Sequence, residues 1–184
     1  MKKILGLGLI FLTILITGCS SDDNNDENNS VSATINGAAW KPTKINSVTL
    51  IKVPGEGQRF DINIQDNSQM LSLAFESELT TNNAMPLRAY NFYEDAEEEE
   101  GVSDALFLNT YLIDGATYTE HLPVSGKITV TSMDPEKKTV SGTFSFRTEK
   151  AGILQTKVVT PEVFEVTNGV FTNLSYTVIV AENK

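Results

Sequence analysis

The densest group of chemically active side chains is an acidic run at residues 94–100, EDAEEEE, which holds six carboxylates in seven positions. Calcium binds six to eight oxygen ligands, and carboxylates supply such oxygens. No D-x-D-x-D-G spacing sets their geometry here, and a run of like charges is usually extended and solvated. We therefore interpret the run as a solvated loop, keep a weak calcium site as the alternative, and predict no resident metal ion or cofactor.

Candidates for catalysis are few in this chain. His121 is the only histidine and Cys19 the only cysteine, which excludes an intrachain disulfide and a zinc site built from Cys and His. No G-x-S-x-G elbow presents a serine to His121, which we expect to lie in a surface turn. A carboxylate pair for glycoside cleavage depends on its separation in three dimensions. We predict no catalytic residues, and a hydrolase is the least favoured function.

Aromatic side chains offer a better basis for ligand binding. Tyr90 and Tyr93 belong to the cluster YNFY at residues 90–93, which directly precedes the acidic run and is expected near one end of the domain. An aromatic face suits the apolar C–H face of a sugar ring. Core packing is the alternative for these residues and for Trp40, because large aromatics in a β domain usually fill its interior. We predict Tyr90 and Tyr93 as ligand-binding residues.

The N-terminus has the features of a lipoprotein signal. Two lysines precede an apolar stretch at residues 4–16; as a helix it spans about 20 Å, less than the ~30 Å hydrocarbon core of a bilayer. The sequence ITGC at residues 16–19 then resembles a bacterial lipobox. We predict that residues 1–18 form a signal peptide. Cys19 is predicted to receive diacylglycerol, to become the mature N-terminus and to anchor the protein in a membrane.

A polar tether follows the anchor. Residues 20–30 read SSDDNNDENNS and contain no apolar side chain, so we expect residues 19–30 to be disordered and extended. Ser21, Asp22 and Asp23 resemble the surface-export signal of Bacteroidota lipoproteins. That resemblance implies an outer-membrane lipoprotein whose domain faces the cell exterior. A generic spacer on a periplasm-facing lipoprotein is the alternative.

Apolar and polar residues alternate along much of the remaining chain, which is the pattern of half-buried strands. Residues 60–65 and 71–76 alternate in this way on either side of the turn sequence Asp-Asn-Ser. Residues 127–131 and 140–146 do so on either side of Asp-Pro-Glu-Lys. We predict two hairpins, each with its apolar residues, phenylalanines included, on the buried face.

Further segments are consistent with β structure. The Asn-Gly pair at residues 36–37 suits a tight hairpin turn, whereas the pair at 168–169 is either a second turn or a bulge within one bent strand. Residues 48–53, 105–113 and 175–180 are more continuously apolar, as strands covered on both faces are. These segments add strands to the two hairpins.

Taken with the hairpins, these segments predict a single all-β domain over residues 31–184. We expect an antiparallel β-sandwich or a partly open barrel of about nine or ten strands, with little helix. The formal net charge of −10 becomes −12 when the two lysines leave with the signal peptide. Such a surface repels a phosphate backbone, so nucleic acid is excluded as a partner.

Three motifs occur in order behind the lipobox: INGAAW at residues 35–40, SGTFSF at 141–146 and VTNGVF at 166–171. In this order they resemble a family of Bacteroidota lipoprotein domains of uncharacterised function, and the likeness covers most of residues 31–176. The resemblance implies an all-β extracytoplasmic domain and supplies no catalytic residues.

These features together favour a non-enzymatic binding module, held at the outer membrane by the lipid on Cys19, for a glycan, a peptide or another envelope protein. A structural or assembly lipoprotein of the envelope is the alternative. An exposed, concave cluster around Tyr90 and Tyr93 is expected for the first function, and a flat apolar patch of several hundred Å² for the second.

Overall fold

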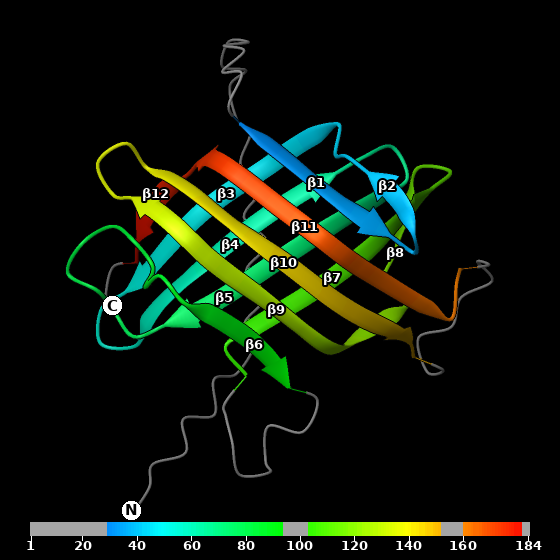
Figure 1. Cartoon of the computed structure of the whole chain (residues 1–184). Coiled ribbons are helices and arrows are strands. Elements are labelled where there is room, and N and C mark those ends of the chain that lie inside the picture. Colours follow the sequence, from blue (N-terminus) through cyan, green and yellow to red (C-terminus); the bar gives the residue numbers. More distant parts are fainter. Residues whose placement is uncertain (1–28, 94–102, 152–159, 182–184) are drawn as a thin grey trace, which may run out of the picture.

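The structure, a computed structural model, describes residues 29–93, 103–151 and 160–181 (Figure 1). The predictions for several segments lie outside the described residues: the signal peptide at 1–18, the lipidation site Cys19, the export signal Ser21, Asp22 and Asp23, and the acidic run at 94–100.

The described residues form twelve β-strands and no helix, so none of them belongs to a helix that is long and apolar enough to cross a membrane. The strands are β1 (Ser30–Ile35), β2 (Ala38–Trp40), β3 (Lys44–Val53), β4 (Gly57–Gln65), β5 (Gln69–Ser77), β6 (Ala89–Tyr93), β7 (Ala105–Ile113), β8 (Ala116–Tyr118), β9 (His121–Asp134), β10 (Thr139–Lys150), β11 (Val163–Ser175) and β12 (Thr177–Val180). The sequence predicted about nine or ten strands because β6 and β8, five and three residues long, are too short to show a clear period of two.

The strands form two six-stranded sheets. Sheet A has the order β2-β1-β11-β10-β9-β6, and sheet B has the order β12-β3-β4-β5-β7-β8. The two sheets lie face to face, and their strands cross in the view of Figure 1. The predicted all-β sandwich is therefore confirmed.

The core fills the space between the sheets. β4 pairs with β5, and β9 with β10, in antiparallel register, so both predicted hairpins are confirmed. Their alternating apolar side chains are buried as expected: Phe60, Ile62, Ile64, Leu71, Leu73, Phe75, Phe144 and Phe146. Trp40 also belongs to this core.

The two Asn-Gly pairs have different roles. Asn36 and Gly37 have φ values of 46° and 81° between β1 and β2, and this is the predicted tight turn. Asn168 also has a positive φ of 52°, but β11 continues through it and the register of its pairing with β10 shifts nearby. The second pair is therefore a bulge within one strand.

Two details differ from the sequence prediction. β12 pairs with β3 in parallel, because the chain passes from sheet A to sheet B at Tyr176 and does not turn back in a hairpin. The more continuously apolar strands are also not covered on both faces, since Leu106 of β7 and Val180 of β12 are exposed. The exposure of Leu106 bears directly on the candidate site.

Candidate functional site

The two sheets are joined at one lateral edge by Asp104, the residue before β7. Its backbone N–H donates to the carbonyl of Asn91 in β6 (3.0 Å), and its carbonyl accepts from the N–H of Glu76 in β5 (2.9 Å). The carboxylate Oδ1 accepts a further hydrogen bond from the Asn91 N–H at 2.5 Å, and Oδ2 pairs with Arg88. These bonds hold β6 of sheet A beside β5 of sheet B.

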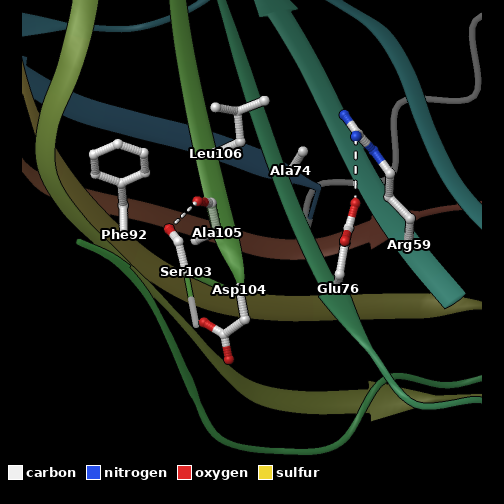
Figure 2. A pocket seen from close by; sticks show the side chains of 8 residues that line it. All are labelled: Arg59, Ala74, Glu76, Phe92, Ser103, Asp104, Ala105 and Leu106. Atoms are coloured by element: carbon white, nitrogen blue, oxygen red, sulfur yellow. Dashed lines mark hydrogen bonds and ion pairs between the residues drawn. The ribbon is translucent and has the colours of Figure 1, made fainter. Parts of the chain in front are cut away.

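A cleft of about 230 Å³ opens beside this joint (Figure 2). We call it the edge cleft; it is lined by Arg59, Ala74, Glu76, Phe92, Ser103, Asp104, Ala105 and Leu106. Figure 2 shows Phe92 on one side and the Arg59–Glu76 pair on the other, with Leu106 and Ala74 between them. Strands β4, β5, β6 and β7 all contribute to it.

The polar side of the edge cleft is an ion-pair network. Arg59 and Glu76 lie opposite each other in the ladder between β4 and β5. Arg59 donates from Nε to Asp61 Oδ1 at 2.9 Å and from Nη1 to Glu76 Oε1 at 3.4 Å. Burial raises the pKa of the Asp61 carboxyl, and the Arg59 guanidinium only partly offsets that effect. Arg59 and Glu76 remain partly exposed. The cleft therefore offers hydrogen-bond donors from Arg59 and acceptors from Glu76 side by side.

The rest of the cleft wall is apolar. Phe92 packs against the core while remaining partly exposed, and Leu106 is 38% exposed. Leu106 pairs with Ala74 across β7 and β5, so both point to the outer face of sheet B. A mainly apolar wall with a few polar groups is the usual make-up of a ligand site. Because ligand pockets span roughly 300–1,000 Å³, this cleft suits a single ring.

Of the two tyrosines predicted as ligand-binding residues, Tyr90 does not line this cleft. Tyr90 is fully buried; its ring lies 4.7 Å from that of Phe75, and its hydroxyl donates to the Pro86 carbonyl at 2.7 Å. Arg88 covers the ring, with Cζ 3.9 Å from its centroid. Burial raises the pKa of Tyr90 to about 12. Tyr90 is therefore a core residue, the alternative that the sequence left open.

Tyr93 ends β6, where its backbone pairs with Ser125. Its side chain lies outside the described part of the structure. The member of the predicted cluster that reaches the edge cleft is Phe92, which stands between the two tyrosines in the sequence. The prediction that Tyr93 binds a ligand therefore stays a prediction.

His121 is buried at the start of β9, and the expectation of a surface turn is wrong. Its Nε2–H donates to the Pro161 carbonyl at 2.7 Å. Its ring centroid lies 5.7 Å from that of Tyr111 and 6.3 Å from that of Phe164. The strand begins at His121 itself, so its side chain already points into the core. His121 lines no part of the edge cleft.

Metal binding finds no support in the residues that the structure covers. Across 29–93, 103–151 and 160–181, no group of three or more His, Cys, Asp or Glu side chains is placed to hold an ion. The acidic run at 94–100 is outside those ranges, so its weak calcium site stays a prediction.

The sequence analysis missed Arg59 and Glu76, although a signal for them exists. The hairpin pairs Phe60 with Phe75, and this register places Arg59 directly opposite Glu76 on the outer face. An opposite-charge pair was therefore predictable from the hairpin. That this pair shares a cleft with Phe92 was not predictable, because the cleft depends on how β6 is joined to sheet B.

Comparison with known proteins adds a family. The model of the family described as "Domain of unknown function (DUF6252)" matches residues 27–175, which include every residue that lines the edge cleft. No curated protein matches the chain, and no solved structure does.

Proposed function

The chain belongs to the DUF6252 family, a domain of unknown function. We propose that it is a non-enzymatic binding module that takes one saccharide ring of a glycan into the edge cleft. The observation that carries the proposal is the composition of this cleft. Phe92 and Leu106 supply apolar surface for the C–H face of a sugar, and the Arg59–Glu76 pair supplies partners for its hydroxyls.

A binding role fits the state of the carboxylates in the cleft. Asp104 is engaged by the Asn91 N–H and by Arg88, and it holds the two sheets together. Glu76 lies beside a guanidinium. Groups held in this way position a ligand through hydrogen bonds. The proposal therefore assigns no catalytic residue.

The placement of the domain is part of the same proposal. Cys19 carries the lipid anchor, and Ser21, Asp22 and Asp23 direct the protein to the outer leaflet of the outer membrane, so that the domain faces the cell exterior. The polar residues up to Ser30 then act as a tether of about 20 Å, long enough to lift β1 clear of the headgroups. The net negative charge, −12 once the signal peptide is removed, favours neutral or cationic partners and disfavours nucleic acid.

The proposal is tested by screening the full-length protein on a glycan array beside two matched variants. Leu106→Ala removes apolar surface from the cleft, and we expect its glycan binding to fall about fivefold, since roughly 1 kcal/mol of apolar contact is lost. Leu122→Ala is the control, because Leu122 is 50% exposed and does not line the cleft; its binding is expected to match wild type.

Other outcomes identify the competing functions. If glycan binding is unchanged in Leu106→Ala, the edge cleft is not the glycan-binding site. Capture of an envelope protein without any glycan binding favours the structural or assembly lipoprotein. Turnover of a glycan or peptide places the protein among the hydrolases.

A further inference from the structure

We infer that the saccharide bound by the edge cleft is an amino sugar, whose free ammonium group pairs with Glu76. This inference rests on the proposed function and narrows its ligand class. It starts from the unequal way in which Arg59 holds its two acidic partners.

Arg59 is tied more closely to Asp61 than to Glu76. The Nε–Oδ1 distance to Asp61 is 2.9 Å, within the usual range of a charge-assisted hydrogen bond, whereas the Nη1–Oε1 distance to Glu76 is 3.4 Å. A ligand cation can therefore take Glu76 as its partner while Arg59 keeps Asp61. No buried charge is left unpaired by that exchange.

Glu76 is also the more accessible carboxylate of the described cleft lining. Its side chain is 43% exposed, compared with 24% for Asp104. Asp104 is further committed to the Asn91 N–H and to Arg88, which are part of the joint between the sheets. An incoming ammonium group thus meets Glu76 first, on the side of the cleft opposite Phe92 (Figure 2).

Arg59 distinguishes an amino sugar from a lysine side chain. A guanidinium has donors and no acceptors, and so does an ammonium. A lysine side chain therefore offers Arg59 only a like charge. An amino sugar offers its ring hydroxyls as acceptors to Arg59, its ammonium to Glu76 and its C–H face to Leu106. A neutral sugar matches the same cleft but gains nothing from the net charge of −10.

The test is a calorimetric titration of the full-length protein, held in neutral detergent at about pH 6, where the sugar amine is protonated. Three tetramers with the same linkage serve as probes: glucosamine, N-acetylglucosamine and glucose. They differ in one substituent, so differences in Kd report the ammonium. We expect the glucosamine tetramer to bind about fivefold tighter than the glucose tetramer, with that advantage lost in high salt.

Two charge variants show whether Glu76 is responsible. Glu76→Gln is expected to remove the advantage of the glucosamine tetramer and to leave binding of the glucose tetramer within about twofold. Glu149→Gln is the control, because Glu149 is a comparably exposed carboxylate (49%) that pairs with Arg147 on sheet A; its preference is expected to match wild type.

Each remaining outcome overturns a defined part of the account. Equal binding of the three tetramers overturns the amino-sugar inference and leaves the saccharide-binding proposal intact. A preference that survives Glu76→Gln, or tighter binding of an acetylated lysine amide than of the glucosamine tetramer, also overturns the inference. Failure of all three tetramers to bind, with glycan-array binding absent as well, overturns the proposed function itself.

Discussion

Two glycines and two phenylalanines explain why the SGTFSF and VTNGVF motifs occur together. Gly142 pairs with Phe171 and Phe144 pairs with Gly169 across β10 and β11, so that each ring lies over a glycine of the neighbouring strand. A Cβ atom on Gly142 would lie 2.5 Å from the ring of Phe171, and one on Gly169 would lie 2.6 Å from that of Phe144. The two motifs are thus complementary halves of one packing arrangement.

Gly142→Ala is predicted to destabilise the protein by about 1–3 kcal/mol, because the added Cβ would also lie 2.3 Å from the carbonyl oxygen of Thr129 and a well-packed core yields little. Thr143→Ala, one residue along on the exposed face, is the control and is expected to change stability by less than about 0.5 kcal/mol. Urea denaturation measures both; equal stability of the two variants contradicts this packing argument.

The sequence was enough to predict which residues of β6 share one face of the strand. It was not enough to predict how deeply each side chain is buried in the sandwich. Tyr90 and Phe92 share one face of the strand because they are two residues apart. Tyr90 pairs with Ile128, deep in the core, whereas Phe92 pairs with Gly126 and reaches the cleft. Both positions hold an aromatic residue at the same place in the strand's alternation, so the sequence pattern does not distinguish them. Burial is decided by which strand of the other sheet lies opposite, and this is a long-range property.

Cys19→Ala is predicted to abolish incorporation of labelled palmitate and to release the protein from the membrane fraction, because no other thiol is present to carry the lipid. Wild type provides the reference for both measurements. Retention of label in the alanine variant would falsify the assignment of Cys19 as the anchor.

At the scale of elements, the turn between β4 and β5 is stabilised by one carboxylate. Asp66 Oδ1 accepts hydrogen bonds from the backbone N–H groups of Ser68 and Gln69, both at 2.7 Å, and Oδ2 accepts from the Trp40 indole at 2.6 Å. Burial acts to raise the pKa of Asp66, but these hydrogen bonds outweigh it and hold the pKa below its usual value. The turn therefore depends on ionised Asp66.

The sign of this effect makes a pH-dependent prediction. A carboxyl group whose pKa is lower in the folded state contributes stability above its unfolded pKa of about 3.9, and loses it as the pH falls through the folded value. We expect the free energy of unfolding to fall for Asp66→Asn at neutral pH, by about 1 kcal/mol. That difference from wild type is expected to shrink steadily below about pH 4.

The fluorescence of Trp40, the only tryptophan, provides the readout for both proteins during urea unfolding. In the native wild type it also reports directly on the indole–Asp66 hydrogen bond. A stability difference between the two proteins that stays constant from neutral pH down to the acid limb contradicts the role of the carboxylate.

Hairpins were the most predictable elements, because each combines alternation with a recognisable turn. The pairing of β4 with β5 and of β9 with β10 follows from the sequence for this reason. The parallel β12 gave no such signal, since its four residues carry no turn and its partner β3 is distant in sequence. The short β8 gave no signal either, whereas the Asn-Gly pair at residues 36–37 predicted the hairpin of β1 and β2.

At the scale of the whole molecule, the sandwich was predictable and the edge cleft was not. The fold class follows from the number of alternating segments and their turns. The cleft arises where β6 of sheet A is joined to β5 of sheet B through Asp104, and this brings Phe92 into the same cleft as Arg59, which is 33 positions away in the sequence. The exposure of Leu106 follows from the same arrangement, although the apolar run at residues 105–113 predicted a strand covered on both faces.

The most direct test of ligand binding in the edge cleft is a map of backbone amide chemical shifts in the full-length protein during titration with the tightest-binding of the three tetramers. The account predicts that the largest shifts occur at Glu76, Phe92 and Leu106, which line the cleft. Largest shifts at Thr129 and Thr143, on the outer face of sheet A, or no shift with any tetramer, would contradict it.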